Sequence, residues 1–142
     1  MASEATRGSR RRGSARRHVV GRVGEIPDGG RKVVEVERRS IGIFRVGDRY
    51  YAVRNRCPHQ GGPLCLGVTT GLVTSDVPGD YALTREGEIL RCPWHGWEFD
   101  LHDGRSVVDP EGTRVRSYQV EVELRAEVYP VEVQERALVL LM

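Results

Sequence analysis

The chain has 142 residues, of which 39% are hydrophobic and 30% are charged, so its length suits one domain and leaves no room for a second sizeable catalytic domain. No apolar run approaches the roughly 18 residues that a membrane-spanning helix needs, so we expect no membrane association. The formal net charge of +2 is unevenly distributed, because residues 1–17 hold six of the 22 basic residues and one of the 20 acidic ones. The rest of the chain is slightly acidic, which argues against specific nucleic-acid binding.

Residues 1–17 mix arginine with glycine and serine and show no apolar periodicity. Such a composition cannot bury enough surface to offset the entropy of ordering, so we expect a disordered, arginine-rich tail. The triplet Arg10-Arg11-Arg12 is not an export signal, because the apolar segment of about 7–15 residues that should follow it is broken at Gly21. We therefore expect a cytoplasmic protein with one folded domain over residues 18–142.

From His18 onward the hydrophobic pattern repeats every two residues, which is typical of β-strands. Gly47-Asp48 predicts a hairpin turn before the strand at residues 50–53, and Asp103-Gly104 predicts a second hairpin. Further strands are expected in three apolar or alternating stretches near the C-terminus, residues 120–124, 131–133 and 138–141. No helical period of 3.6 residues is visible, so the sequence predicts a small all-β domain.

Two short segments contain two of the three cysteines and two of the four histidines. The first covers residues 57–65 and begins Cys57-Pro58-His59; the second covers residues 92–99 and begins Cys92-Pro93-Trp94-His95. Each segment supplies one thiolate and one imidazole, and turn-forming residues surround both. Two loops of matching chemistry indicate a pair that closes on one inorganic centre.

Two centres fit two cysteines and two histidines: a tetrahedral zinc ion or a cluster of two irons and two sulfides. Structural zinc sites usually separate paired ligands by two to five residues, and the C-x-H spacing of Cys57 and His59 is awkward for one tetrahedral ion. In a two-iron cluster each loop can send its cysteine to one iron and its histidine to the other. The spacing therefore favours Cys57 and Cys92 on a buried iron, with His59 and His95 on an outer iron, and zinc stays open as the alternative.

The motifs C-P-H-Q-G-G-P-L and C-P-W-H-G-W-E-F-D resemble those of Rieske iron–sulfur proteins, specifically the ferredoxin branch that serves ring-hydroxylating oxygenases. The resemblance extends from about His18 to the C-terminus. It implies an antiparallel β-sandwich or barrel with a small cluster-binding subdomain of two loops, and one Rieske-type [2Fe–2S] cluster. It also implies an electron carrier, not an enzyme in itself, that accepts electrons from a flavin- or NAD(P)H-linked reductase and passes them to a terminal oxygenase. His59 and His95 would lie at the exposed tip, where the electron leaves.

Other residues of the two loops are expected to limit water access to the cluster and to bring backbone N–H groups close to its sulfurs. These residues are Gly61, Pro63, Leu64, Trp94, Gly96 and Trp97. High-potential members of the family also carry a disulfide between the loops, and Gly62 and Trp94 stand at those positions here. The resemblance therefore implies a reduction potential at the low end of the Rieske range, near about −150 mV.

Three features lie outside this pattern. Cys65 is expected to be a buried structural thiol and His102 a surface residue. The 32 residues between His59 and Cys92 exceed what most family members carry, so we expect an inserted hairpin within residues 68–88. Only His18 and His102 are left for a mononuclear iron site, which excludes a stand-alone oxygenase; a redox-sensing or accessory subunit of a larger oxidoreductase is the alternative to a carrier.

Overall fold

The computed structural model describes residues 16–125 and 135–142; the tail expected at residues 1–17 lies almost entirely outside these ranges, as does the strand expected at residues 131–133. The described elements are nine strands and one 3₁₀ helix of three residues, so the all-β prediction is confirmed. Within the described ranges no helix has the length and apolar character to cross a membrane. The chain forms two compact units, one from Gly24–Ser117 and one from the described residues on either side of it.

The unit that joins the two ends of the chain is a three-stranded antiparallel sheet. Its central strand, β9 (Glu135–Leu141), pairs with β1 (Arg17–Arg22) on one edge and with β8 (Ser117–Arg125) on the other. The consecutive side chains from Ala137 to Leu140 are all buried, so neither face of β9 is open to solvent over these residues. β1 begins one residue before the expected domain boundary.

The first sheet of the Gly24–Ser117 unit is an antiparallel meander of β2 (Arg31–Val36), β3 (Arg39–Val46) and β4 (Arg49–Arg54). The turn predicted at Gly47-Asp48 connects β3 to β4. The β2–β3 turn has no glycine: Glu37 and Arg38 occupy it with φ of 52° and 67°, the conformation of a tight hairpin turn in which both central residues have positive φ.

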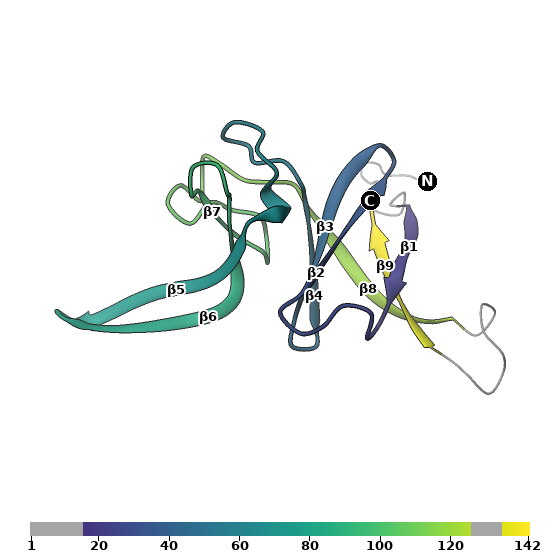
Figure 1. Ribbon diagram of the computed structural model, residues 1–142, viewed down its shortest axis with the longest axis horizontal. Helices are drawn as coiled ribbons and strands as arrows, with labels where there is room; N and C mark the ends of the chain where they lie inside the picture. Colours follow the sequence, from purple (N-terminus) through teal and green to yellow (C-terminus); the bar gives the residue numbers. More distant parts are fainter. Residues whose placement is uncertain (1–15, 126–134) are drawn as a thin grey trace, which may run out of the picture. The chain divides into compact units, whose positions relative to one another are not determined.

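The second sheet of the same unit contains β5 (Val68–Val77), β6 (Asp80–Arg91) and β7 (Glu98–Asp100), in that order. Figure 1 shows β5 and β6 as a long two-stranded arm whose turn lies at the far end from β7 and from the 3₁₀ helix η2 (Leu64–Leu66). The segment in which we expected an inserted hairpin therefore is a hairpin, although its second strand continues to Arg91. Val73 and Tyr81 on this arm are 69% and 70% exposed.

The core of the Gly24–Ser117 unit lies beside η2 and includes both cysteines of the two loops. Ten buried residues form it, with Tyr51 and Trp97 packed against them: Phe44, Val53, Cys57, Leu64, Cys65, Leu90, Cys92, Phe99, Leu101 and Val115. Strands β3, β4, β6 and β7 all contribute to this cluster. The fold therefore anchors the start of each loop in rigid, close-packed surroundings.

Candidate metal centre

The first loop (residues 57–62) follows β4, and the second loop (residues 92–97) connects β6 to β7. Both are closed by the same pair of backbone hydrogen bonds. The Cys57 N–H donates to the Gly62 carbonyl at 2.8 Å and the Gly61 N–H donates to the Cys57 carbonyl at 2.7 Å. In the second loop the Cys92 N–H donates to the Trp97 carbonyl at 2.7 Å and the Gly96 N–H donates to the Cys92 carbonyl at 3.0 Å.

The equivalence of the two loops includes their backbone conformation. Gly61 and Gly96, each four residues after the cysteine, have φ of 78° and 73°, a region that side chains with a Cβ adopt at a cost. The motif glycines are thus explained by the turn that closes each loop. The two loops are two copies of one backbone frame, even though the histidine is the second residue after the cysteine in one and the third in the other.

The cysteines and histidines lie at different depths. Cys57 and Cys92 are 2% and 3% exposed, whereas His59 and His95 are exposed. The two imidazole rings meet edge to face, with centroids 5.1 Å apart and an interplanar angle of 88°. The structure therefore brings all four sequence-predicted residues together, with two sulfurs beneath and two imidazoles at the surface.

The two thiols share one buried environment. Burial raises the pKa of Cys57, the backbone N–H groups of His59 and Gln60 act in the opposite direction, and the neighbouring Cys92 side chain raises it further. Two adjacent buried thiolates need positive charge between them, which metal ions supply when they bind deprotonated cysteines. The N–H groups directed at the Cys57 sulfur are also donors of the kind that tune iron–sulfur centres.

This donor set fits a two-iron cluster better than a single ion. Cys57 and His59 are two residues apart, a spacing that is awkward for two ligands of one tetrahedral ion, whereas a cluster with two protein ligands on each iron accommodates it. The buried sulfur pair and the exposed imidazole pair match the two ends of such a cluster.

Two tryptophans of the second loop contact the first loop. The Trp97 ring is stacked on His59, with centroids 4.6 Å apart and an angle of 19°, and it also lies parallel to Phe99 of the core. The Trp94 indole covers Gly62 so closely that a Cβ on Gly62 would lie 2.8 Å from Trp94 Cδ2. Trp94 is nevertheless 56% exposed. Gly62 and Trp94, the positions at which the sequence resemblance implies a disulfide in high-potential proteins, are therefore in direct contact here.

The remaining residues expected around the cluster continue the first loop into η2. Pro63 is half-buried and Leu64 is fully buried. Cys65 is buried as well, and burial raises the pKa of its thiol to about 12. Its Sγ lies 3.6 Å from the Val53 carbonyl oxygen, so Cys65 is placed as the structural thiol that the sequence suggested.

Sequence reasoning missed the polar side chains that hold η2 behind the first loop. Arg31 Nη1 donates to the Cys65 carbonyl at 2.8 Å and to the Gly67 carbonyl, while its guanidinium lies over the Phe44 ring. Asn55 accepts a hydrogen bond from the Cys65 N–H at 2.7 Å. The sequence separation of these contacts leaves no local pattern by which they could have been found.

A second polar group lies at the base of the β5–β6 arm. Arg85 bonds both carboxylate oxygens of Asp100, at 2.8 and 2.9 Å, and Glu88 at 2.7 Å. Bonding to Arg85 lowers the pKa of Glu88. At Asp100 burial acts to raise the pKa, but the Arg85 bonds, the His102 N–H and the positive charge of Arg85 together outweigh it, so the pKa is lowered. His102 is a surface residue as expected, and its Nε2 lies 2.9 Å from Glu88 Oε1 and 3.0 Å from the Tyr51 hydroxyl.

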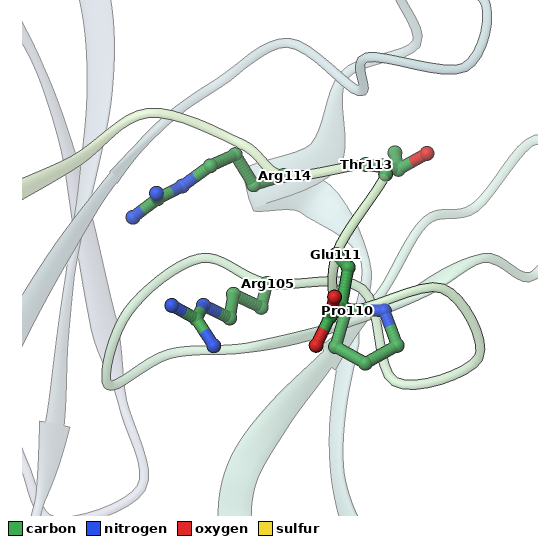
Figure 2. Close-up of a pocket in the computed structure, with 6 residues that line it drawn as sticks. Arg105, Pro110, Glu111, Thr113 and Arg114 are labelled. Atoms are coloured by element: carbon green, nitrogen blue, oxygen red, sulfur yellow. The ribbon is translucent and has the colours of Figure 1, made fainter.

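A pocket of about 350 Å³ is lined by Arg105 and by residues 110–114, and none of the cysteines or histidines lines it. Figure 2 shows Arg105 and Arg114 extending in the same direction, away from Pro110 and Glu111. Both guanidinium groups already contact Asp103, Arg105 its carboxylate at 3.8 Å and Arg114 its carbonyl at 3.2 Å. We therefore assign no ligand to this pocket.

The chain is similar to ferredoxins of dioxygenase systems and to parts of larger proteins. Ferredoxin CarAc of Metapseudomonas resinovorans is 28% identical over 99 residues, which cover 70% of this chain and 77% of the relative. The ferredoxin component of the naphthalene 1,2-dioxygenase system of Pseudomonas aeruginosa is 27% identical, with 70% and 80% covered. Methylxanthine N1-demethylase NdmA of Pseudomonas putida is 31% identical over 75 residues, but the chain spans only 17% of its length.

Solved structures confirm the fold prediction. The ferredoxin of carbazole 1,9a-dioxygenase from Nocardioides aromaticivorans IC177 superimposes with a TM-score of 0.59 at 22% identity, covering 85% of this chain and 95% of that one. The model of the family described as "Rieske [2Fe-2S] domain" matches residues 16–119, which include both loops. The chain therefore belongs to the Rieske [2Fe–2S] domain family, and its cofactor is a Rieske-type [2Fe–2S] cluster.

Proposed function

We propose that this protein is a one-electron carrier, a ferredoxin that accepts an electron from a flavin- or NAD(P)H-linked reductase and delivers it to a terminal oxygenase. The observation that carries the proposal is the layered arrangement of two buried cysteines beneath two exposed, mutually contacting imidazoles. A centre held in this way has one insulated side and one side open to a protein partner. The two ferredoxin relatives, of which the chain covers 77% and 80%, support a carrier over an enzyme.

In this proposal Cys57 and Cys92 hold the inner iron, and His59 and His95 hold the outer iron. The cluster, when bound, supplies a site that takes up and releases one electron. The chain fixes the ligands through the closed loops, excludes water from the sulfurs by burial, and orients His59 by stacking on Trp97. The exposed imidazoles form the edge through which a partner would exchange electrons.

The proposed reduction potential is at the low end of the Rieske range, near about −150 mV. Neutral imidazoles in place of two thiolates raise the potential above that of all-cysteine clusters, because less negative charge opposes the incoming electron. The disulfide of high-potential relatives is replaced by the contact between Trp94 and Gly62. A low potential suits electron transfer from a reduced flavin to an oxygenase of the kind found with the ferredoxins in carbazole dioxygenase complexes.

The reductase and a cytoplasmic location are part of the proposal. The direct test is low-temperature EPR of the dithionite-reduced protein, with iron and acid-labile sulfide measured on the same sample. We expect a rhombic signal of the mixed histidine–cysteine type and equal amounts of iron and sulfide. Addition of NADH and a dioxygenase-type ferredoxin reductase should produce the same signal. A silent sample with stoichiometric zinc would overturn the proposal, and cell fractionation tests the location.

A further inference from the structure

An arginine directly precedes each loop cysteine, and both side chains lie back against their own loop. A Cβ built on Gly61 would lie 3.4 Å from Cζ and Nη2 of Arg56. A Cβ built on Gly96 would lie 3.4 Å from Nε and 3.5 Å from Nη2 of Arg91. Gly61 and Gly96 are the glycines of the turns that close the two loops, so each guanidinium group lies against the closing turn of a loop that carries an exposed imidazole.

These two arginines differ from the structural arginines of the same unit. Arg31 and Arg85 each donate to two or more carbonyl or carboxylate groups. In contrast, Arg56 and Arg91 are exposed and form no ion pair with a carboxylate within the described ranges. This holds even for Glu98, which lies opposite Arg91 in the β6–β7 register. Their positive charge is therefore available to a partner.

The charge around them is mainly positive. Residues 56–65 and 91–99 contain two arginines, two histidines and one acidic residue, Glu98. The exposed indole of Trp94 lies within this face. Protein interfaces are enriched in tryptophan and arginine, with a desolvated aromatic group near the centre and charged groups around it. The chain beyond residue 17 holds 16 basic and 19 acidic residues, so its net charge is slightly negative.

We propose that Arg56, His59, Arg91, Trp94 and His95 form a cationic docking face that binds a carboxylate-lined surface on the redox partner. The inference rests on the proposed function and adds the chemistry by which the partner is recognised. A cationic face around the imidazoles attracts an acidic partner surface and so favours encounters that bring the imidazoles to the partner. The indole of Trp94 would then bury its exposed face against an apolar patch between the carboxylates.

The test measures electron exchange between the full-length, cluster-loaded protein and gold electrodes that carry monolayers of known charge. Carboxylate-terminated and amine-terminated alkanethiols serve as the probes. Wild-type protein should exchange electrons faster on carboxylate than on amine. The double variant Arg56→Gln, Arg91→Gln should lose about tenfold of the rate on carboxylate, the scale of electrostatic steering. Surface plasmon resonance on the same monolayers gives the amount bound independently of electron transfer.

The matched control is Arg11→Gln, Arg12→Gln, which removes the same charge from the N-terminal segment. It should lower the amount bound but leave the exchange rate per bound molecule unchanged. The double variant Arg56→Lys, Arg91→Lys restores the charge without the guanidinium shape and should recover most of the rate. The docking proposal would be wrong if Arg56→Gln, Arg91→Gln and the Arg11, Arg12 control lost the same amount of exchange rate. It would also be wrong if the wild-type protein exchanged electrons equally fast on both monolayers. The EPR signal of the same samples shows whether the cluster is present. Failure of the electron-carrier proposal is therefore distinguishable from failure of the docking proposal.

Discussion

Gly67 is the position at which one added methyl group should do most damage to the cluster site. It follows η2 and precedes β5, and it has φ of −78°, so its backbone conformation is open to any residue. The constraint is contact: a Cβ there would overlap the carbonyl oxygen of Arg91, and it would lie 2.9 Å from the Arg91 carbonyl carbon. Arg91 is joined directly to Cys92. A methyl group on Gly67 therefore pushes against the backbone that carries the second loop.

The size of the effect follows from that geometry. Carbon atoms pack best at about 3.5–4.0 Å, so the 2.9 Å contact alone requires a separation of at least about 0.6 Å, and the overlap with the oxygen requires more. Overpacking of this kind costs about 1–3 kcal/mol, and the upper end applies because no side-chain rotation can relieve a clash between backbone atoms. We expect Gly67→Ala to lower the free energy of unfolding by about 3 kcal/mol and to reduce cluster content, because the two loops are forced apart.

The assay is urea unfolding together with iron and acid-labile sulfide per chain. Gly47→Ala is the matched control: it adds the same methyl group at the β3–β4 turn, where φ is 64° and nothing lies within 4 Å. It should cost only about 1 kcal/mol of left-handed strain and leave the cluster complete. If Gly67→Ala binds a full cluster and is no less stable than Gly47→Ala, the close contact between the backbones of Gly67 and Arg91 is refuted.

Three further predictions concern the loops and the base of the arm. Gly62→Ala should destabilise the protein by about 1–3 kcal/mol because its methyl group meets the Trp94 indole, and adding Trp94→Ala should remove most of that extra cost in a double-mutant cycle followed by urea unfolding. His95→Cys should lower the reduction potential, measured by EPR-monitored redox titration, because a thiolate adds negative charge and moves the centre toward the about −400 mV of all-cysteine plant-type clusters. Arg85→Gln should lower the free energy of unfolding at pH 7, and the deficit should shrink as the pH falls below about 4.

The sign of the last prediction follows from the lowered pKa values. Asp100 and Glu88 hold their protons more weakly in the folded protein than in the unfolded chain, so the stability that they contribute is complete above the unfolded pKa and is lost as the pH falls through the folded one. A deficit in Arg85→Gln that is constant from pH 7 to pH 3 would contradict it. An unchanged potential in His95→Cys would refute the ligand assignment, and additive costs in the Gly62 and Trp94 cycle would refute their contact.

Local chemistry was readable from the sequence, and long-range contact was not. The turn at Gly47-Asp48 and the pairing of the two loops were found because turn residues and ligand spacing act within a few positions. The β2–β3 turn was missed because Glu37 and Arg38 adopt positive φ without the glycine or asparagine that usually marks it. Arg17 was assigned to the tail, yet it is in β1 and pairs with Glu121 across 104 positions.

The contacts that hold the two loops close together were not predictable from the sequence. Arg31 reaches the Cys65 carbonyl from a strand 34 positions away, and the fit of Gly67 against Arg91 depends on how η2 meets β6. Both contacts depend on the register of the strands. The sequence predicts that the fold is all-β, but it does not predict that register. The four ligand candidates could be named because their chemistry is unusual; the residues that support them are ordinary and gain their role from position alone.

The shared frame of the two loops separates the scaffold from the chemistry that it presents. In both loops the hydrogen bonds join the cysteine to the residues four and five positions later, and none of them involves the residue that carries the imidazole. The three positions inside each frame can therefore exchange side chains without unmaking the turn. Replacing Pro58-His59-Gln60 by the tripeptide Pro-Trp-His of the second loop would move one imidazole by one residue while the fold stays as it is. Each loop therefore keeps the same backbone frame, and the three residues inside the frame determine where its imidazole lies along the loop.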